Sequence, residues 1–276
     1  LLGAVVLAVG GKELKFVQMA CINIVVAANA GGAFSPFGDI TTLMVWQADK
    51  VEFFGFFKLF LPSLVNFLVP AIIMSFFIPQ GKPEAGEEIF EMRKGAKRIV
   101  FLFFLTIALA VGMKQAFNLP PYMGMMISLG LFTVFAEYFS NRDFSHGDVD
   151  GHHSPVHKAL GRIEMPSLLF FLGILMTVAA LESLGMILDF GNNVVEGIGI
   201  NPFILILGGA SAIVDNVPLV AASMGMFPNM ATDAPEWHLI AYAAGTGGSM
   251  LIIGSAAGVV AMGMEKIDFF WYLKKI

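Results

Sequence analysis

Long apolar segments recur along the whole chain, and they constrain its fold more than any other feature. The segments 53–78, 99–117, 122–139 and 166–188 are each long enough to cross the ~30 Å hydrocarbon core of a bilayer as a helix. Charged residues make up only 13% of the chain, about half the share in an average soluble domain. Because backbone polar groups find no water inside a bilayer, such segments must be helical. The sequence therefore predicts an all-α integral membrane protein.

Two further apolar segments, 16–46 and 237–264, are interrupted near their middle by glycine-rich stretches. In both, a pair of glycines is followed by another glycine six residues after the second. The first segment has Gly31, Gly32 and Gly38, with Pro36 between them, and the second has Gly247, Gly248 and Gly254. Such residues unwind a helix, and unpaired backbone groups are too costly to leave against lipid. We therefore predict two broken helices that line a binding centre, in preference to two simple packing kinks.

The two interruptions align at a constant offset of 216 residues. If segments 79–98 and 140–163 lie in the cytoplasm and the spans alternate, 13 of the 16 Lys and Arg residues fall on the cytoplasmic side. This distribution follows the positive-inside rule, and it makes the first broken helix run outward and the second inward. The sequence thus predicts an inverted-repeat secondary transporter.

The same distribution of basic residues requires segment 202–227 to enter and leave the membrane on one side, as a re-entrant hairpin. Its centre carries Asp215 and Asn216, and a carboxylate at membrane depth is a functional residue by default. Subtracting the offset places the tip of an equivalent first hairpin just before Leu1. We therefore expect residues 1–9 to be the exit arm of that first hairpin.

These features predict three regions. Residues 1–139 form the C-terminal part of the first repeat, 140–163 a cytoplasmic loop rich in histidine, and 164–276 the second repeat. The second repeat then comprises span 166–188, re-entrant hairpin 202–227 and broken helix 237–264. Histidines and carboxylates of the loop could bind a divalent metal or sense pH, but their spacing matches no fixed-site pattern, so a flexible loop is the preferred interpretation.

The residues around both breaks and the hairpin tip, 29–42, 211–218 and 245–256, closely resemble NhaD-type sodium/proton antiporters of the ion transporter superfamily. The glycine breaks indicate the superfamily, whereas the run Ser-Pro-Phe-Gly-Asp-Ile-Thr-Thr beginning at Ser35 indicates the antiporter branch. The resemblance covers essentially the whole chain. It implies a scaffold bundle and a transport bundle with two hairpins and two broken helices, of which the first hairpin tip and the final helix are expected to lie outside this chain.

The resemblance also implies a multi-pass protein of the bacterial inner membrane that contacts lipids and forms a homodimer. We expect no bound cofactor beyond the transported Na⁺ and H⁺, and no nucleic-acid partner. Li⁺ is a further expected cargo. No catalytic dyad or zinc-ligand motif lies in a span, so the sequence does not predict an enzyme.

An antiporter needs a group that holds either a proton or Na⁺, and a carboxylate beside hard oxygen ligands meets this need. Asp39 and Asp215 are the two predicted proton- and ion-binding carboxylates. Further oxygen ligands are expected from Asn29, Ser35, Thr41, Thr42, Asn216, Thr246, Ser249 and Ser255. Asp39 also stands where it could cap the helix that begins at Ile40, and the two roles can coexist. Glu182 is either a proton relay or a residue near the outer surface of its span.

Two other functions stay open. An anion transporter of the same superfamily, for arsenite or a dicarboxylate, would favour neutral hairpin tips, and Asp39 and Asp215 argue against it. An inactive structural subunit of a membrane complex could retain the transporter fold without any transport.

Overall fold

The computed structural model describes residues 13–78, 96–143 and 165–251, together with single positions outside these ranges. Within these ranges every regular element is a helix. The chain divides into two compact units, one formed by Leu1–Glu88 and Ile174–Ile276 and the other by Ile89–Gly173. All of the predicted site residues belong to the first of these units.

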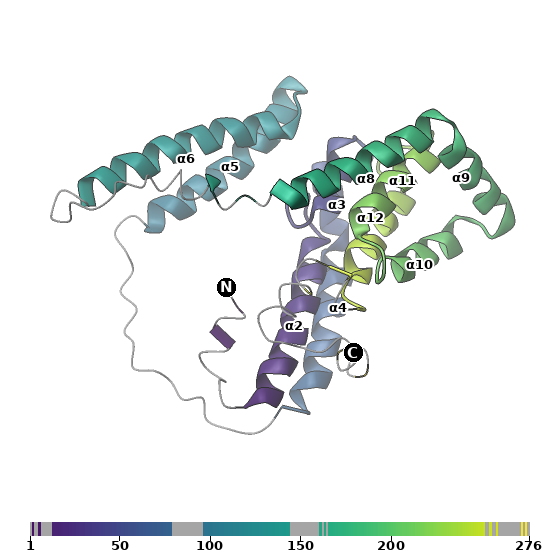
Figure 1. Ribbon diagram of the computed structural model, residues 1–276, viewed down its shortest axis with the longest axis horizontal. Helices are drawn as coiled ribbons and strands as arrows, with labels where there is room; N and C mark the ends of the chain where they lie inside the picture. Colours follow the sequence, from purple (N-terminus) through teal and green to yellow (C-terminus); the bar gives the residue numbers. More distant parts are fainter. Residues whose placement is uncertain are drawn as a thin grey trace. The chain divides into compact units, whose positions relative to one another are not determined.

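The smaller unit contains α5 (Ala96–Phe117) and α6 (Pro121–Asp143), which pack along each other (Figure 1). A tight turn joins them: Asn118 takes a left-handed conformation at φ 55°, which Asn tolerates, and Pro121 begins α6. Gly124 lets the helices approach closely, because a side chain there would meet the backbone of Leu109. The hydroxyls of Thr106 and Ser128 bond to each other between the two helices.

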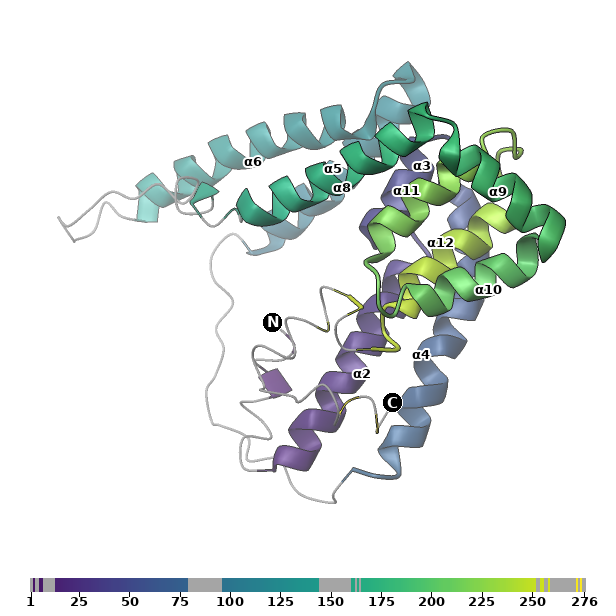
Figure 2. The ribbon, with the colours of Figure 1, turned by 45° about the vertical axis from the view of Figure 1, so that its right-hand side comes forward.

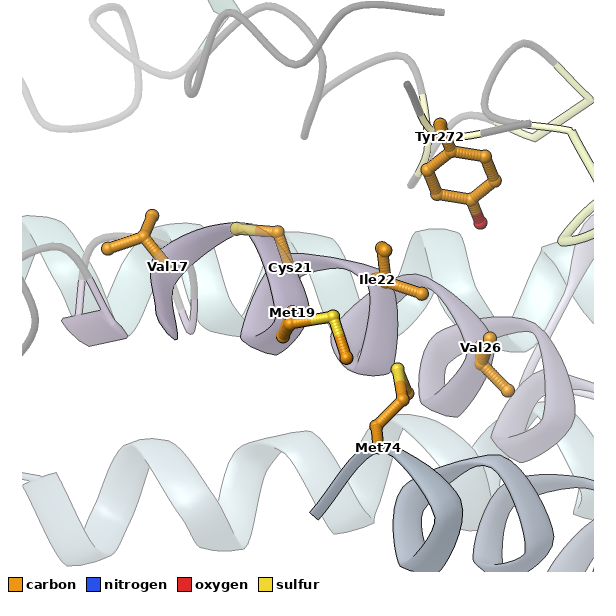
Figure 3. Packing of buried hydrophobic residues seen from close by; sticks show 7 residues of the cluster. All are labelled: Val17, Met19, Cys21, Ile22, Val26, Met74 and Tyr272. Carbon is orange, nitrogen blue, oxygen red and sulfur yellow. The ribbon is translucent and has the colours of Figure 1, made fainter. Parts of the chain in front are cut away.

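The first half of the larger unit consists of α2 (Leu14–Gly32), α3 (Ile40–Gln47), the short η1 (Phe53–Leu59) and α4 (Phe60–Ser75). Helices α2 and α4 lie side by side in both views (Figures 1 and 2). Figure 3 shows the buried cluster against α2, which is made of Val17, Met19, Cys21, Ile22 and Val26 with Met74 of α4 and Tyr272. Cys21 is 2% exposed and is therefore buried within this cluster.

The second half contains the end of α8 (Met165–Ser183), then α9 (Met186–Gly197), α10 (Ile200–Ala210), α11 (Asn216–Met226) and α12 (Pro235–Gly247). Helix α10 packs against α12, and α11 contacts α3, α9 and α12 (Figure 2). Small residues permit this packing, because side chains at Gly208 and Gly247 would meet the facing backbone. The predicted hairpin segment 202–227 corresponds to α10 and α11, two helices of 11 residues each that are joined by a turn. Neither helix alone is long enough to cross a bilayer.

The predicted span 166–188 contains a bend that its sequence did not indicate. Helix α8 ends at Ser183, and the chain bends by 75° between Leu168–Ser183 and Met186–Gly197. Gly185 takes a left-handed conformation at φ 74°, which ends the helix and starts α9 in a new direction. The residues after the bend are still apolar, so hydropathy alone extended the span to Leu188.

Among the described residues, Phe53–Ser75 and Lys97–Phe117 are long and apolar enough to cross a membrane, and the bent pair of α8 and α9 counts as a third span if taken as one. Their large apolar side chains are exposed rather than buried, among them Leu61, Val65, Ile72, Phe103 and Phe104. Such surfaces suit contact with lipid. Segment 146–157, most of 1–9 and most of 252–264 lie outside the described residues.

Candidate functional site at two helix breaks

The first break is the segment between the end of α2 at Gly32 and the start of α3 at Ile40. Two backbone turns shape it: the Ala33 amide donates to the Ala30 carbonyl over 3.3 Å, and the Gly38 amide donates to the Ser35 carbonyl over 3.1 Å. Gly38 lies so close to Gly32 that a side chain at Gly38 would collide with the Gly32 backbone. The Gly32 backbone therefore leaves no room for a side chain at position 38, and only glycine fits there.

The second break follows the end of α12 at Gly247 and repeats these contacts at an offset of 216. The Ser249 amide donates to the Thr246 carbonyl over 3.0 Å, and the Gly254 amide donates to the Leu251 carbonyl over 3.0 Å. Gly248 and Gly254 face each other as Gly32 and Gly38 do, and a side chain at either would collide with backbone. The correspondence found in the sequence thus extends to the backbone hydrogen bonds.

Asp39 stands at the end of the first break and caps the N-terminus of α3. Its Oδ1 accepts from the Ile40 amide over 2.7 Å, and its own amide donates to the Thr42 hydroxyl over 3.3 Å. The predicted cap role of Asp39 is therefore confirmed. The positive end of the α3 dipole favours negative charge on this carboxylate.

The second oxygen of Asp39 is the point where three elements meet. Asp39 Oδ2 accepts from the buried Thr41 hydroxyl over 2.7 Å and from the Asn216 side-chain amide over 2.9 Å. Asn216 belongs to the tip of the α10–α11 hairpin. Gly245 of α12 lies on another side of the same oxygen, where a Cβ atom would be 3.4 Å away. The structure thus joins three segments that lie up to about 200 residues apart in the sequence.

Asp215 caps the N-terminus of α11, and its Oδ1 accepts from the Val217 amide over 3.4 Å. Because Asn216, the first residue of α11, bonds to Asp39, the N-termini of two helices, each capped by an aspartate, lie close together. Asp215 directly precedes Asn216, whose side-chain amide bonds to Asp39. The arrangement concentrates negative charge beside the Asn216 amide, as a cation site requires.

Asn29 and Ser255 connect the two breaks directly. The Asn29 side-chain amide donates to the Ser255 hydroxyl over 3.0 Å and to the Val25 carbonyl over 3.1 Å. Asn29 lies in the last turn of α2, whereas Ser255 follows the second break. These two predicted ligands therefore bond to each other.

Four other predicted residues make no hydrogen bond to the Asp39 carboxylate among the described contacts. The hydroxyls of Thr246 and Ser249 donate to the carbonyls of Tyr242 and Thr246, as helical Ser and Thr residues often do. Ser35 contributes its carbonyl to the turn of the first break. Glu182 is exposed. A Cβ atom added at Gly225 would contact Glu182, and Gly225 lies about 14 Å along α11 from Asn216.

A second polar cluster, which we did not predict from the sequence, connects the loop after α3 to the loop before α12. We call it the loop clamp and define it by Asp49, Lys50, Glu52, Lys58, Thr232, Asp233 and His238. Asp233, at φ 62°, donates from its amide to the Lys50 carbonyl over 2.9 Å, and its Oδ1 accepts from the Glu52 amide over 3.1 Å. His238 Nε2 lies 3.3 Å from the same oxygen, and Lys58 Nζ lies 3.9 Å from Oδ2.

The only signal for this cluster in the sequence was an Asp before Ala-Pro at a helix start, which is typical of any polar turn. The loop clamp joins the far ends of α3 and α12, whose other ends meet at Asp39 and Gly245. It therefore fixes how these two helices lie against each other.

Replacing Asp233 tests the loop clamp. Asp233→Asn keeps an oxygen for the Glu52 amide and tolerates the left-handed backbone, whereas Asp233→Ala provides neither. We expect Asp233→Ala to unfold at a clearly lower temperature, with a loss of about 1–3 kcal/mol in the free energy of unfolding, and Asp233→Asn to lose less. Thermal unfolding of the purified protein in detergent measures both. Equal unfolding temperatures of Asp233→Ala and the parent protein would show that the loop clamp does not contribute to stability.

The helical fold and its exposed apolar spans define a multi-pass membrane protein. Residues 1–247 match the family described as citrate transporter. The chain is 44% identical over 299 residues to the Na(+)/H(+) antiporter NhaD of Vibrio parahaemolyticus, an alignment that covers 99% of this chain and 70% of that protein. It is 43% identical to the antiporter of the same name from Vibrio cholerae and 44% identical to that from Halomonas elongata, covering 99% and 96% of this chain.

The chain therefore belongs to this transporter family and, with these relatives, to the NhaD-type sodium/proton antiporters. It spans 61% of the length of the Vibrio cholerae relative and 57% of that of the Halomonas elongata relative.

Proposed function

We propose that this chain carries the ion-binding centre of an antiporter that exchanges Na⁺ or Li⁺ for H⁺ across a membrane. One observation carries the proposal: a single carboxylate oxygen, Asp39 Oδ2, is shared by the Thr41 hydroxyl and the Asn216 amide at the meeting point of a helix break and a hairpin tip. The names of the relatives, which agree on sodium and proton as cargo, support the same function.

The two groups that bond to Asp39 can each switch from donor to ligand. A hydroxyl that turns its proton away presents oxygen lone pairs, and the Asn216 amide carries a carbonyl oxygen beside its NH₂ group. Na⁺ is a hard cation that prefers oxygen donors, so the Asp39 carboxylate, the Thr41 hydroxyl and the Asn216 carbonyl would form part of its shell. The Na⁺ charge disfavours a proton on the same carboxylate, and binding of the two ions becomes mutually exclusive.

The helix ends favour a cation over an anion. The C-terminal ends of α2 and α12, at Gly32 and Gly247, direct partial negative charge toward the breaks. The N-terminal ends of α3 and α11, which would otherwise attract an anion, are already capped by Asp39 and Asp215. A dicarboxylate or another anion would meet two carboxylates at this point, which argues against the anion-transporter alternative.

The wider architecture belongs to the same proposal. The matching hydrogen bonds at both breaks support an inverted repeat, in which the broken helices and the hairpin 202–227 rearrange to expose the site to either side. We place segments 79–98 and 140–163 in the cytoplasm because of their basic residues, and the protein in the bacterial inner membrane as a homodimer in contact with lipids. Glu182, at the end of α8, is a proposed relay toward the site.

Ion flux tests the function. In everted vesicles that contain the complete protein, addition of Na⁺ or Li⁺ should dissipate a preformed pH gradient and restore the fluorescence of a ΔpH dye. Uptake of arsenite or a dicarboxylate without any Na⁺ response would favour the anion transporter instead. A folded protein that moves neither would favour the structural subunit.

The role of Asn216 gives a graded prediction. Asn216→Ala removes one bond to Asp39 and one oxygen ligand while leaving the carboxylate in place. We expect the Na⁺ concentration for half-maximal response to rise about tenfold, the effect of about 1.4 kcal/mol. Asn192→Ala, an exposed position on α9, is the matched control and should leave that concentration unchanged. An unaltered Na⁺ response in Asn216→Ala would remove Asn216 from the site.

A further inference from the structure

Gly245 is the least expected residue beside Asp39. It lies inside α12, where Gly is less favourable than Ala by up to about 1 kcal/mol, and its backbone has no positive φ that would require glycine. Its contacts suggest another reason. A Cβ atom at Gly245 would lie 3.4 Å from Asp39 Oδ2 and 3.6 Å from Thr41 Oγ1, and among the described residues outside the adjoining turns of α12 no other atom comes within 4 Å of that point. Gly245 therefore borders a space beside the carboxylate oxygen.

The offset of 216 identifies what occupies the corresponding space at the other break. Position 245 corresponds to Asn29, and Ser255 corresponds to Asp39. The Asn29 amide bonds to the Ser255 hydroxyl over 3.0 Å, so that contact is filled by a side chain. At the equivalent contact, Gly245 provides no group at all toward Asp39. The two breaks have matching backbone hydrogen bonds, but one has a neutral bonded pair where the other has a carboxylate beside a methyl-sized space.

We propose that the transported cation binds in this space beside Asp39 Oδ2, at the place that the Asn29 amide fills in the other break, and that Gly245 sets the size of ion accepted. This inference rests on the proposed exchange function. Small hard cations bind oxygen at about 2.0–2.1 Å, as Mg²⁺ does, and larger ones at about 2.3–2.6 Å, as Ca²⁺ does. Li⁺ and Na⁺ differ in the same direction. A methyl group 3.4 Å from Oδ2 therefore hinders Na⁺ more than Li⁺.

The substitution Gly245→Ala is a clean probe of this space. Its added methyl group would make only ordinary van der Waals contacts, so the helix can keep its position. In the complete protein, we expect Gly245→Ala to raise the half-saturating Na⁺ concentration about tenfold and the Li⁺ concentration less than about threefold. The matched control is Gly209→Ala, an exposed helical glycine of α10 whose Cβ would meet nothing within 4 Å. It should alter neither value.

A second variant restores the symmetry between the breaks. Gly245→Asn places an amide where Asn29 has one, and we expect it to suppress the responses to both ions, because the amide takes the place of the cation.

For Gly245→Ala the readout is the ratio of the Li⁺ and Na⁺ half-saturating concentrations, which does not depend on the amount of folded protein. Equal shifts for both ions, or no shift, in a responsive protein would overturn the inference about Gly245 alone. A parent protein that responds to neither ion would overturn the proposed function as well.

Discussion

Asp39→Asn is expected to abolish exchange. The amide has the size of the carboxylate and remains a good helix cap, so α3 should still begin at Ile40. However, it can neither ionise nor exchange a proton at the oxygen that contacts Thr41 and Asn216. We expect the Na⁺- and Li⁺-induced recovery of ΔpH-dye fluorescence in everted vesicles to fall at least about a hundredfold, which corresponds to about 2.7 kcal/mol.

The control for Asp39 is Asp189→Asn, which neutralises an exposed carboxylate in the first turn of α9. It changes the net charge equally but should leave the response intact. A response that persists in Asp39→Asn would exclude this carboxylate as the exchanging group. Asp215→Asn should weaken exchange less, because the Asp215 carboxylate, apart from its charge, contacts only the N-terminus of its own helix among the described hydrogen bonds.

Gly38→Ala is expected to have the second-largest effect, and it acts on the fold of the break. The added Cβ atom would collide with the carbonyl, Cα and C atoms of Gly32, and backbone atoms cannot swing aside as a flexible side chain can. Forcing an extra carbon into a packed contact costs about 1–3 kcal/mol in the free energy of unfolding. We expect a lower unfolding temperature in detergent and a strong loss of exchange, because Asp39 follows Gly38 directly.

Gly31→Ala is the matched control, since Gly31 directly precedes Gly32 but a Cβ atom at Gly31 would meet nothing within 4 Å. It should be close to the parent in unfolding temperature. The symmetry of the breaks adds a further expectation: Gly254→Ala should behave like Gly38→Ala, because its Cβ would collide with the carbonyls of Ala212 and Gly248. If Gly31→Ala and Gly38→Ala were equally harmful, contact with Gly32 would not be the cause.

The elements that depend on local chemistry were predictable from the sequence. Helix α2 ends at the pair Gly31–Gly32 and α12 ends at Gly247, as the glycine-rich stretches predicted, whereas the pair Gly208–Gly209 lies inside α10 without interrupting it. The Asp39 cap was also predictable, because it depends only on the residues that follow it. The bend at Gly185 was missed because the sequence on either side is apolar, and hydropathy carries no information on direction.

The contacts between distant segments were not predictable in the same way. Asp39 and Asn216 were both named as site residues, yet no local pattern indicates that they bond across 177 positions. Thr246 was named for its chemistry, but its hydroxyl has a nearer partner in the Tyr242 carbonyl one turn earlier. Gly245 was not predicted as a site residue, because the role of a glycine depends on its neighbours in space.

The most direct test of the central claim is proton release on ion binding. The purified complete protein in weakly buffered detergent solution should release protons when Na⁺ is added, because the cation displaces them from the carboxylate of Asp39. The account predicts release that saturates with Na⁺ in the parent and is absent in Asp39→Asn. Equal release in Asp39→Asn, or no release in a parent protein that binds Na⁺, would contradict it.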